Sequence, residues 1–369
     1  MSENINVPVM PKGDELILSV SPHIHDKVDV RNIMIKVILT LLPATAAAIY
    51  YFEIDAVRVI AVTMLASLAA EGLWFWFARK PLSPLQDGSA LLTGLLLALN
   101  LPGTAPTWVC VLGAFIAIWV GKQVFGGLGN NIFNPALVGR VALLIALPAA
   151  MTTWAPTRAM LAADREQSKV CITGQEMPVQ GEFVTTATPL GVAKDAVKAG
   201  GEKGHEIISG LITPTSYKDY FFGNRGGSLG ETSVLALLIG GIALMCMKLI
   251  KWQIPLCFIA TVAICAAIAH FFAPDRYAPA LFHVMNGGLL LGAFFMATDM
   301  VTSPITSWGC VVFGVGCGVV TAVIRLWGSY PEGVSFSILF MNALVPLIDR
   351  MFQLRPFGYV RPKIQEAAK

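Results

Sequence analysis

The chain has 369 residues, of which 55% are hydrophobic and only 13% are charged. About 25% charged residues is usual for a soluble globular protein, so this composition excludes an ordinary soluble enzyme. The net charge of +3 is too small to indicate a nucleic-acid partner. An integral membrane protein in contact with lipid is the class that fits.

The N-terminal segment, residues 1–31, is polar. It lacks an apolar run followed by a small-residue cleavage site, so we do not expect it to be a cleavable signal peptide. About ten apolar segments follow, and several approach or exceed the ~20 residues that cross a bilayer. Such runs form helices in lipid, because the backbone must satisfy its own hydrogen bonds. The predicted spans are 32–52, 56–77, 88–101, 108–124, 135–151, 232–249, 254–273, 281–298, 305–327 and 334–352.

The Lys and Arg residues near the span ends predict the orientation of the chain. Most of them, including Lys122 and Arg140, fall on the side of the N-terminus, and only Arg58, Arg276 and Arg325 fall in the opposite short loops. Because short cytoplasmic loops carry the excess of basic residues, both termini are predicted to be cytoplasmic. The interval 152–230 then lies on the outer face.

The two sets of five spans are predicted to form an inverted repeat. Five is an odd number, so the second set enters the membrane in the opposite sense. The Gly-Leu-Leu-Leu run at 94–97 recurs at 288–291, and a break follows each copy; chance similarity between Gly- and Leu-rich helices is the alternative. Inverted repeats with interrupted helices place a binding site near the midplane, so we expect a cavity lined by the third and eighth spans.

Acidic residues within or beside the spans are candidates for function, because charge is costly in the membrane. Glu71, Asp87 and Asp299 qualify. Asp299 is favoured because it lies between Thr298 and Thr302 at the break after the eighth span, although a structural cap is an alternative role. The sequence has no C-x-x-C pair and no nucleotide-binding or hydrolase motif, so we predict no metal site and no catalytic residue.

The outer interval contains the Thr-rich stretch 182–190. It is either an ordinary extramembrane loop, or Thr188 is chemically modified. Four motifs elsewhere help to separate these interpretations. They are 21–24 (Ser-Pro-His-Ile), 127–136 (ending Asn-Pro-Ala), 227–233 (ending Gly-Glu-Thr-Ser) and 297–304 (Ala-Thr-Asp-Met-Val-Thr-Ser-Pro).

With these motifs, essentially the whole chain resembles the RnfD subunits of the Rnf complexes, the membrane ferredoxin:NAD oxidoreductases. These subunits are related to the NqrB subunits of the sodium-pumping NADH:quinone reductases. In that family a flavin transferase attaches FMN, through its phosphate, to the last Thr of a D-x-x-[S/T]-G-A-T motif. The resemblance makes Thr188 the acceptor. Glu182, Thr185, Thr186 and Ala187 fill the other motif positions, with Glu182 in place of Asp and Thr186 in place of Gly.

The resemblance also implies a second, non-covalent flavin (riboflavin) and a fold similar to urea transporters. The candidate residues for a second flavin or an ion path are Asn131, Asn134, Thr298, Asp299 and Thr302. The implied role is that of an electron-carrying subunit, not catalytic alone, in a complex that moves Na⁺ or H⁺. Its partners would be a second outer-face flavoprotein, iron–sulfur membrane subunits and, for maturation, the flavin transferase.

The expected fold is therefore an all-α integral membrane protein of the bacterial inner membrane, with one long extracytoplasmic loop. A small-solute channel with the same inverted repeat and no redox role is the rival interpretation. The expected regions are 1–31 (cytoplasmic segment), 32–151 (first membrane repeat), 152–230 (outer loop with the flavinylation motif), 231–352 (second membrane repeat) and 353–369 (cytoplasmic tail).

Overall fold

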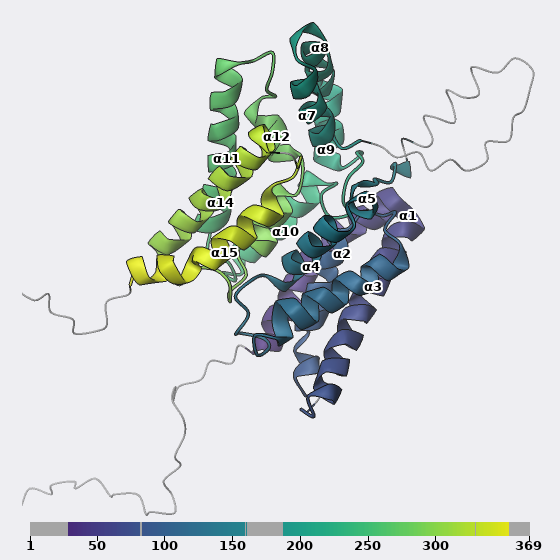
Figure 1. Ribbon diagram of the computed structural model, residues 1–369, viewed down its shortest axis with the longest axis vertical. Coiled ribbons are helices and arrows are strands. Elements are labelled where there is room, and N and C mark those ends of the chain that lie inside the picture. Colours follow the sequence, from purple (N-terminus) through teal and green to yellow (C-terminus); the bar gives the residue numbers. More distant parts are fainter. Residues whose placement is uncertain (1–28, 82, 159, 161–186, 329, 354–369) are drawn as a thin grey trace, which may run out of the picture.

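The computed structural model describes residues 29–81, 83–158, 160, 187–328 and 330–353 (Figure 1). This part of the chain is helical, and its only strand-like pairing is an isolated antiparallel bridge between Pro102 and Ser228. The helices of the first and second halves form two groups in contact, since α1 packs against α10 and α4 against α15. The described residues are therefore all-α, as the sequence predicted.

The first helix, α1 (Val30–Phe77), contains two of the predicted spans. Its 48 residues are interrupted at Glu53, whose backbone is not helical (φ 51°, ψ −126°). This break falls in the predicted gap between residues 52 and 56. The chain turns there because a positive φ is incompatible with a continuing right-handed helix.

The remaining helices of the first half are short, and capping residues and prolines set where they begin and end. Asn134 caps α4, and its side chain accepts hydrogen bonds from the backbone N–H groups of Ala136 and Leu137. Pro148 divides the predicted fifth span in two, because it has no N–H with which to continue a helix. These helices are η1 (Ser83–Asp87, 3₁₀), α2 (Ser89–Leu99), α3 (Thr107–Phe115), η2 (Ile116–Gln123, π), α4 (Pro135–Ala146) and α5 (Pro148–Thr152).

Part of the outer interval is helical, although the sequence led us to expect a loop there. Three helices follow Ala187: α7 (Pro189–Ala199), α8 (Gly201–Leu211) and α9 (Pro214–Phe222). The helices α7 and α9 each begin with a Thr cap followed by Pro. This start signal does not depend on an apolar run, so hydropathy does not predict it.

The second half contains longer helices and one broken segment. The predicted eighth span is not a continuous helix, because Asn286 is extended and Gly287 has a positive φ of 74°. The helices of this half are α10 (Val234–Cys246), α11 (Gln253–Phe272), α12 (Ala280–Met285), α13 (Leu289–Leu291), η3 (Gly292–Met296, π), α14 (Ser307–Trp327) and α15 (Val334–Met351).

Small residues bring helices of the bundle into close contact. A Cβ at Gly240 would clash with the carbonyl oxygen of Thr40, and one at Gly139 would lie 2.8 Å from that of Gly113. Membrane helices pack this way because lipid removes the hydrophobic drive for association and leaves van der Waals contact. A larger residue at either glycine would force the two backbones apart.

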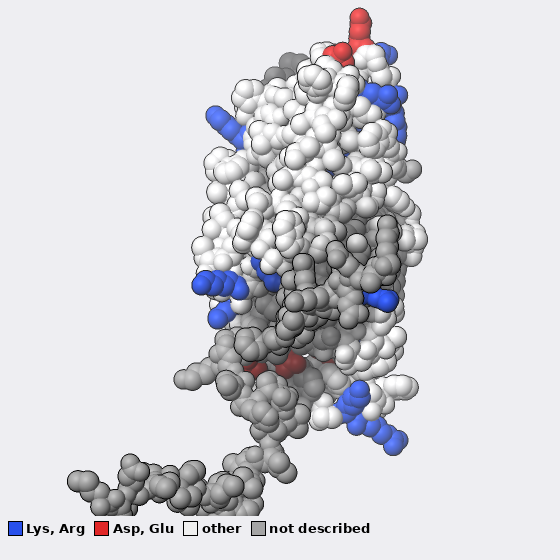
Figure 2. Space-filling view, turned by 90° about the vertical axis from the view of Figure 1, so that its left-hand side faces the viewer, with Lys and Arg blue, Asp and Glu red and all other residues white. Residues whose placement is uncertain are grey.

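Four described helices, α1, α11, α14 and α15, are long and apolar enough to cross a membrane, and several shorter apolar helices accompany them. Large apolar side chains also face outward; Phe271 and Phe272 are more than 80% exposed. Figure 2 shows one face with charged side chains near its top and over its lower half, and an uncharged stretch of surface between these two groups. Both features are those of a protein surrounded by lipid.

Candidate functional site

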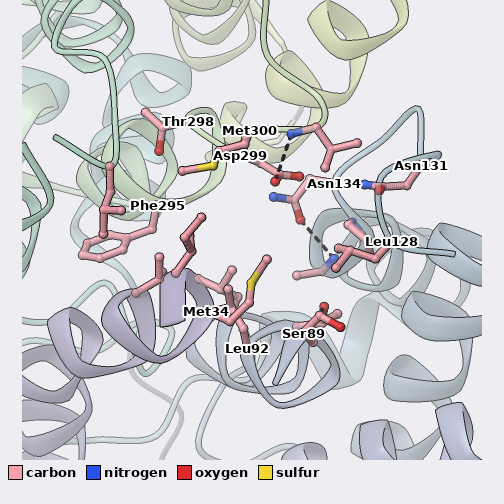
Figure 3. Close-up of a pocket in the computed structure, with 18 of the residues that line it drawn as sticks. Met34, Ser89, Leu92, Leu128, Asn131, Asn134, Phe295, Thr298, Asp299 and Met300 are labelled. Carbon is pink, nitrogen blue, oxygen red and sulfur yellow. Dashed lines mark hydrogen bonds between the residues drawn. The ribbon is translucent and has the colours of Figure 1, made fainter. Parts of the chain in front are cut away.

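A cavity of about 110 Å³ lies among α1, α2, α4, α10 and η3 (Figure 3). Its walls are mostly apolar and include Leu92 and Phe295. Four of the sequence-predicted candidates line it: Asn131, Asn134, Thr298 and Asp299. We call this space the Asp299 cavity. It contains residues from the third and eighth predicted spans.

Asp299 lies in the non-helical segment that follows η3, where its side chain is held by two hydrogen bonds. Its carboxylate accepts hydrogen bonds from the backbone N–H of Val301 (3.5 Å) and from the hydroxyl of Thr302 (3.3 Å). Thr302 therefore contacts the cavity only through Asp299, whereas Thr298 lines it directly and bonds back to the Phe294 carbonyl (2.6 Å). This carboxylate has hydroxyl and amide partners but no basic partner among the described residues.

The two asparagines tie the loop before α4 to the break after η3. Asn134 donates to the carbonyl oxygen of Met296 (3.2 Å) while its own oxygen caps α4. Asn131 donates to the Phe133 carbonyl (3.1 Å), and its side-chain oxygen is buried without a hydrogen-bond partner. Since buried polar groups are nearly always satisfied, this orphan acceptor suits a ligand that donates a hydrogen bond into the cavity.

Sequence reasoning missed the basic residue of this site. Lys122, only 3% exposed, lines the cavity and pairs with Glu71 (Nζ–Oε1 2.5 Å) and Ser89 (2.7 Å). The sequence had assigned Lys122 to the basic residues that set the topology. The partner lies 51 positions away, so no local pattern predicts the pair. Asp87, by contrast, ends η1 and does not line the cavity.

A second group of polar residues surrounds Thr188. Thr188 caps α7 by accepting a hydrogen bond from the backbone N–H of Gly191 (3.1 Å), and it is 6% exposed. It lines a small cavity together with Arg225, Glu231, Asn286 and Glu332. Ala187 is exposed, and the motif residues Glu182, Thr185 and Thr186 lie outside the described residues.

Arg140 joins the two carboxylates of this group. It donates to Glu231 (3.3 Å), to Glu332 and to the Asn100 side chain (2.6 Å). Arg140 was assigned by sequence to the basic residues on the cytoplasmic side, yet it is buried (5% exposed) inside α4. Burial and the adjacent Glu231 carboxylate raise the pKa of Glu332 to about 8. Glu231 and Glu332 can therefore both be buried because each forms an ion pair with Arg140.

Two further buried arginines hold the break in the eighth segment. Arg225 donates to the Met285 carbonyl (2.7 Å), the Asn286 side chain and the Glu231 carbonyl. Arg325 donates to the carbonyls of His283 (2.5 Å) and Asn286 (3.1 Å). We call the whole group the Thr188 cluster; it consists of Arg140, Thr188, Arg225, Glu231, Asn286, Arg325 and Glu332.

Apolar helices of membrane length, one interrupted segment and two polar clusters within the bundle are the features of a multi-span membrane protein. Comparison with known proteins specifies it further. The model of the NQR2, RnfD, RnfE family matches residues 17–358. The chain therefore belongs to this family, in agreement with the resemblance read from the sequence.

Individual relatives are similar over nearly their whole length. The chain is 44% identical to the subunit designated D in the ion-translocating oxidoreductase complex of Stutzerimonas stutzeri, covering 89% of this chain and 92% of the relative. It is 43% identical to the corresponding subunit of the proton-translocating ferredoxin:NAD(+) oxidoreductase complex of Clostridium ljungdahlii (94% and 97% covered). It is 41% identical to that of the Na(+)-translocating complex of Acetobacterium woodii (96% and 98%).

Proposed function

We propose that this chain is the RnfD-type membrane subunit of an Rnf complex, and that it carries electrons through FMN attached to Thr188. The complex would couple electron transfer between ferredoxin and NAD to movement of Na⁺ or H⁺. The similarity to the corresponding subunits of both a proton-translocating and a Na⁺-translocating complex carries this proposal. The relatives differ in their ion, so the coupling ion of this chain is an open choice between the two.

The residues around Thr188 fit an attached flavin phosphate. Thr188 presents its hydroxyl at the N-terminus of α7, where the helix dipole favours a negative group. It shares its cavity with Arg225. FMN, once bound, supplies the redox chemistry, while the protein supplies position and electrostatics. The chain would attach the cofactor permanently and would stabilise the negative charge of its phosphate.

The Asp299 cavity is proposed as the second ligand site, for the coupling ion or for riboflavin. Its apolar walls and the orphan Asn131 oxygen suit a flavin ring edge. Its 110 Å³ is below the roughly 300 Å³ of typical ligand pockets, so riboflavin requires its walls to open. The carboxylate of Asp299 suits a cation without such movement.

The membrane arrangement is part of the proposal. The chain would cross the membrane ten times in two inverted halves, with both termini in the cytoplasm and Thr188 toward the outer face. The distribution of basic residues and the interrupted segments support this arrangement. Lys122 and Arg140 no longer support that orientation because both are buried. We place the chain in the bacterial inner membrane, beside an outer-face flavoprotein and iron–sulfur subunits, with a flavin transferase for maturation.

In-gel flavin fluorescence tests the covalent link. The full chain is produced with a flavin transferase and denatured before electrophoresis. Wild-type protein is expected to fluoresce, and Thr188→Ala is expected to be dark. Thr213→Ala is the matched control, because Thr213 also caps a helix that begins with Pro. A dark wild-type band, or a fluorescent Thr188→Ala band, contradicts the proposal and leaves the channel interpretation in place.

The ion path is tested by Asp299→Asn in the assembled complex. Ion movement is expected to fall at least tenfold while reduction of the complex continues. Asp275→Asn, at an exposed carboxylate between α11 and α12, serves as the control. Unchanged ion transport in Asp299→Asn would remove Asp299 from the path. Flavin analysis of the same protein, extracted under denaturing conditions, reports whether a non-covalent flavin is present.

A further inference from the structure

The Thr188 cluster contains more buried positive charge than buried negative charge. Its three arginines, Arg140, Arg225 and Arg325, are 4–6% exposed. The cluster has two carboxylates, on Glu231 and Glu332, and both pair with Arg140. Within the described residues, the surplus is one positive charge when both carboxylates are ionised, and it is larger when either carboxylate is protonated.

Arg225 and Arg325 lack a carboxylate partner within ion-pair distance in the described part of the chain. All the hydrogen bonds that they donate go to neutral oxygen atoms, which belong to backbone carbonyls or to the side-chain amide of Asn286. The Nε of Arg325 is buried with no hydrogen-bond partner. A buried charge without a counter-ion is strongly unfavourable, so this arrangement is suited to an anion that the chain itself does not provide.

Arg225 has donors left for such an anion. A guanidinium offers five N–H donors, and three hydrogen bonds occupy three of them. Arg225 lines the same small cavity as Thr188, beside Gly226, Gly227 and Gly287. A side chain at Gly287 would approach Nη2 of Arg325 to 2.8 Å. Arg225 is therefore open to the Thr188 cavity, and the missing side chain at Gly287 leaves room beside Nη2 of Arg325.

The size of the cavity limits the anion to a small group. It has room for about 10 Å³, close to what one water molecule needs. A flavin ring does not fit there, and a phosphate attached to Thr188 at the cap of α7 would enter only if the cavity walls move apart. A phosphodiester carries one negative charge, which equals the smallest surplus in the cluster.

We propose that the Thr188 cluster is an anion site that neutralises the phosphodiester on Thr188, with Arg225 as its main counter-charge. This rests on the proposed attachment of FMN. In that attachment a bond forms between Thr188 Oγ1 and phosphorus of a flavin dinucleotide, and the phosphorus–oxygen bond to AMP breaks. AMP leaves with the bonding electron pair, and the hydroxyl proton passes to the transferase. The arginines then hold an otherwise uncompensated anion.

The charge requirement can be tested without flavin or transferase. Thr188→Asp and Thr188→Asn are nearly equal in size and are both good helix caps, so they differ mainly in charge. The melting temperature of the full chain is measured in detergent for each. We expect Thr188→Asp to melt at least roughly 2 °C above Thr188→Asn.

The same pair of substitutions at Thr213 measures the general benefit of a negative helix cap. Thr213 caps α9 in the same way, with Pro at the next position and a hydrogen bond from the third helical N–H. The Asp-minus-Asn difference should be larger at position 188 than at 213. An equal difference, a lower melting temperature for Thr188→Asp, or failure of Thr188→Asp alone to fold would overturn the proposal.

A second measurement identifies the residue that faces the phosphate. Chain produced with transferase is compared with chain produced without it. Attachment is expected to raise the melting temperature of wild-type protein and of Arg225→Lys, but not of Arg225→Met. An equal rise in both variants contradicts the role of Arg225. If wild-type protein takes up no flavin, the proposed function fails, while the comparison of Asp with Asn still decides whether the cluster binds an anion.

Discussion

The Asp299 cavity and the Thr188 cluster differ in the sign of the buried charge that has no ion-pair partner. In the cavity, Lys122 is paired with Glu71, and Asp299 has no basic partner in the described chain. In the cluster, the arginines outnumber the carboxylates. The charges of the described residues therefore favour a cation in the cavity and an anion in the cluster. A chain that fixes a phosphate at one site and handles a cation at another needs both.

The two sites are close enough to influence each other. Asn134 of the cavity caps α4, and Arg140 of the cluster lies on that helix, roughly 9 Å further along its axis. Asn100 also joins them, because it accepts from Arg140 and donates to the sulfur of Met296 (3.6 Å). Perturbing either site separately tests whether the contrast in charge is what stabilises the bundle.

The largest effect is expected from Arg140→Met. It leaves Glu231 and Glu332 buried without their shared counter-ion, and removing one partner of a buried ion pair costs about 3–5 kcal/mol. Thermal melting in detergent should show a large loss of stability or no folded protein. Arg158→Met is the control, since the Arg158–Glu53 pair is largely exposed and worth about 1 kcal/mol or less. Equal losses would mean that the cluster does not depend on Arg140.

A smaller loss is expected from Lys122→Met, about 3 kcal/mol. Glu71 would lose its cation but keep a hydrogen bond from Gln123 (2.8 Å). Adding Glu71→Gln to Lys122→Met should restore part of the stability, because the uncompensated charge is then gone. Melting curves of the single and double variants measure this recovery. A double variant no more stable than Lys122→Met would show that the pair contributes packing and not charge balance.

The smallest of these effects is expected from Asn134→Ala. This change removes the cap of α4 and the bond to Met296, with an expected loss of about 2 kcal/mol. Thr213→Ala removes a cap alone and should lose about 1 kcal/mol. Chemical or thermal unfolding of both variants gives the difference. Equal losses would mean that the link between α4 and η3 adds nothing.

The sequence predicted the helices well where a long apolar run stands alone. The span predicted at 254–273 coincides with the helix Gln253–Phe272, because about twenty apolar residues have the length and composition of one membrane helix. The break in the eighth segment was not predicted. The helix is interrupted at Asn286 and Gly287, where Arg225 and Arg325, distant in sequence, satisfy the freed backbone and side-chain oxygens.

The polar sites were predicted only in part, for a related reason. Asn131, Asn134, Thr298 and Asp299 were all named from sequence, and all line one cavity. The basic residues Lys122 and Arg140, by contrast, were predicted to lie at the cytoplasmic side and are buried in ion pairs. Arg140 pairs with Glu231 across 91 positions, and such a pairing depends on how helices pack, which local hydropathy does not report. Short amphipathic helices such as α7 were likewise missed because they are not apolar.

Intact-mass measurement shows whether Thr188 carries the flavin phosphate. The full chain produced with a flavin transferase is expected to be heavier than the chain produced without it by one FMN less one water. Peptide fragmentation should place the added mass on Thr188, and Thr188→Ala should show none. An unchanged mass for the wild-type chain, or an adduct that persists in Thr188→Ala, would contradict the account.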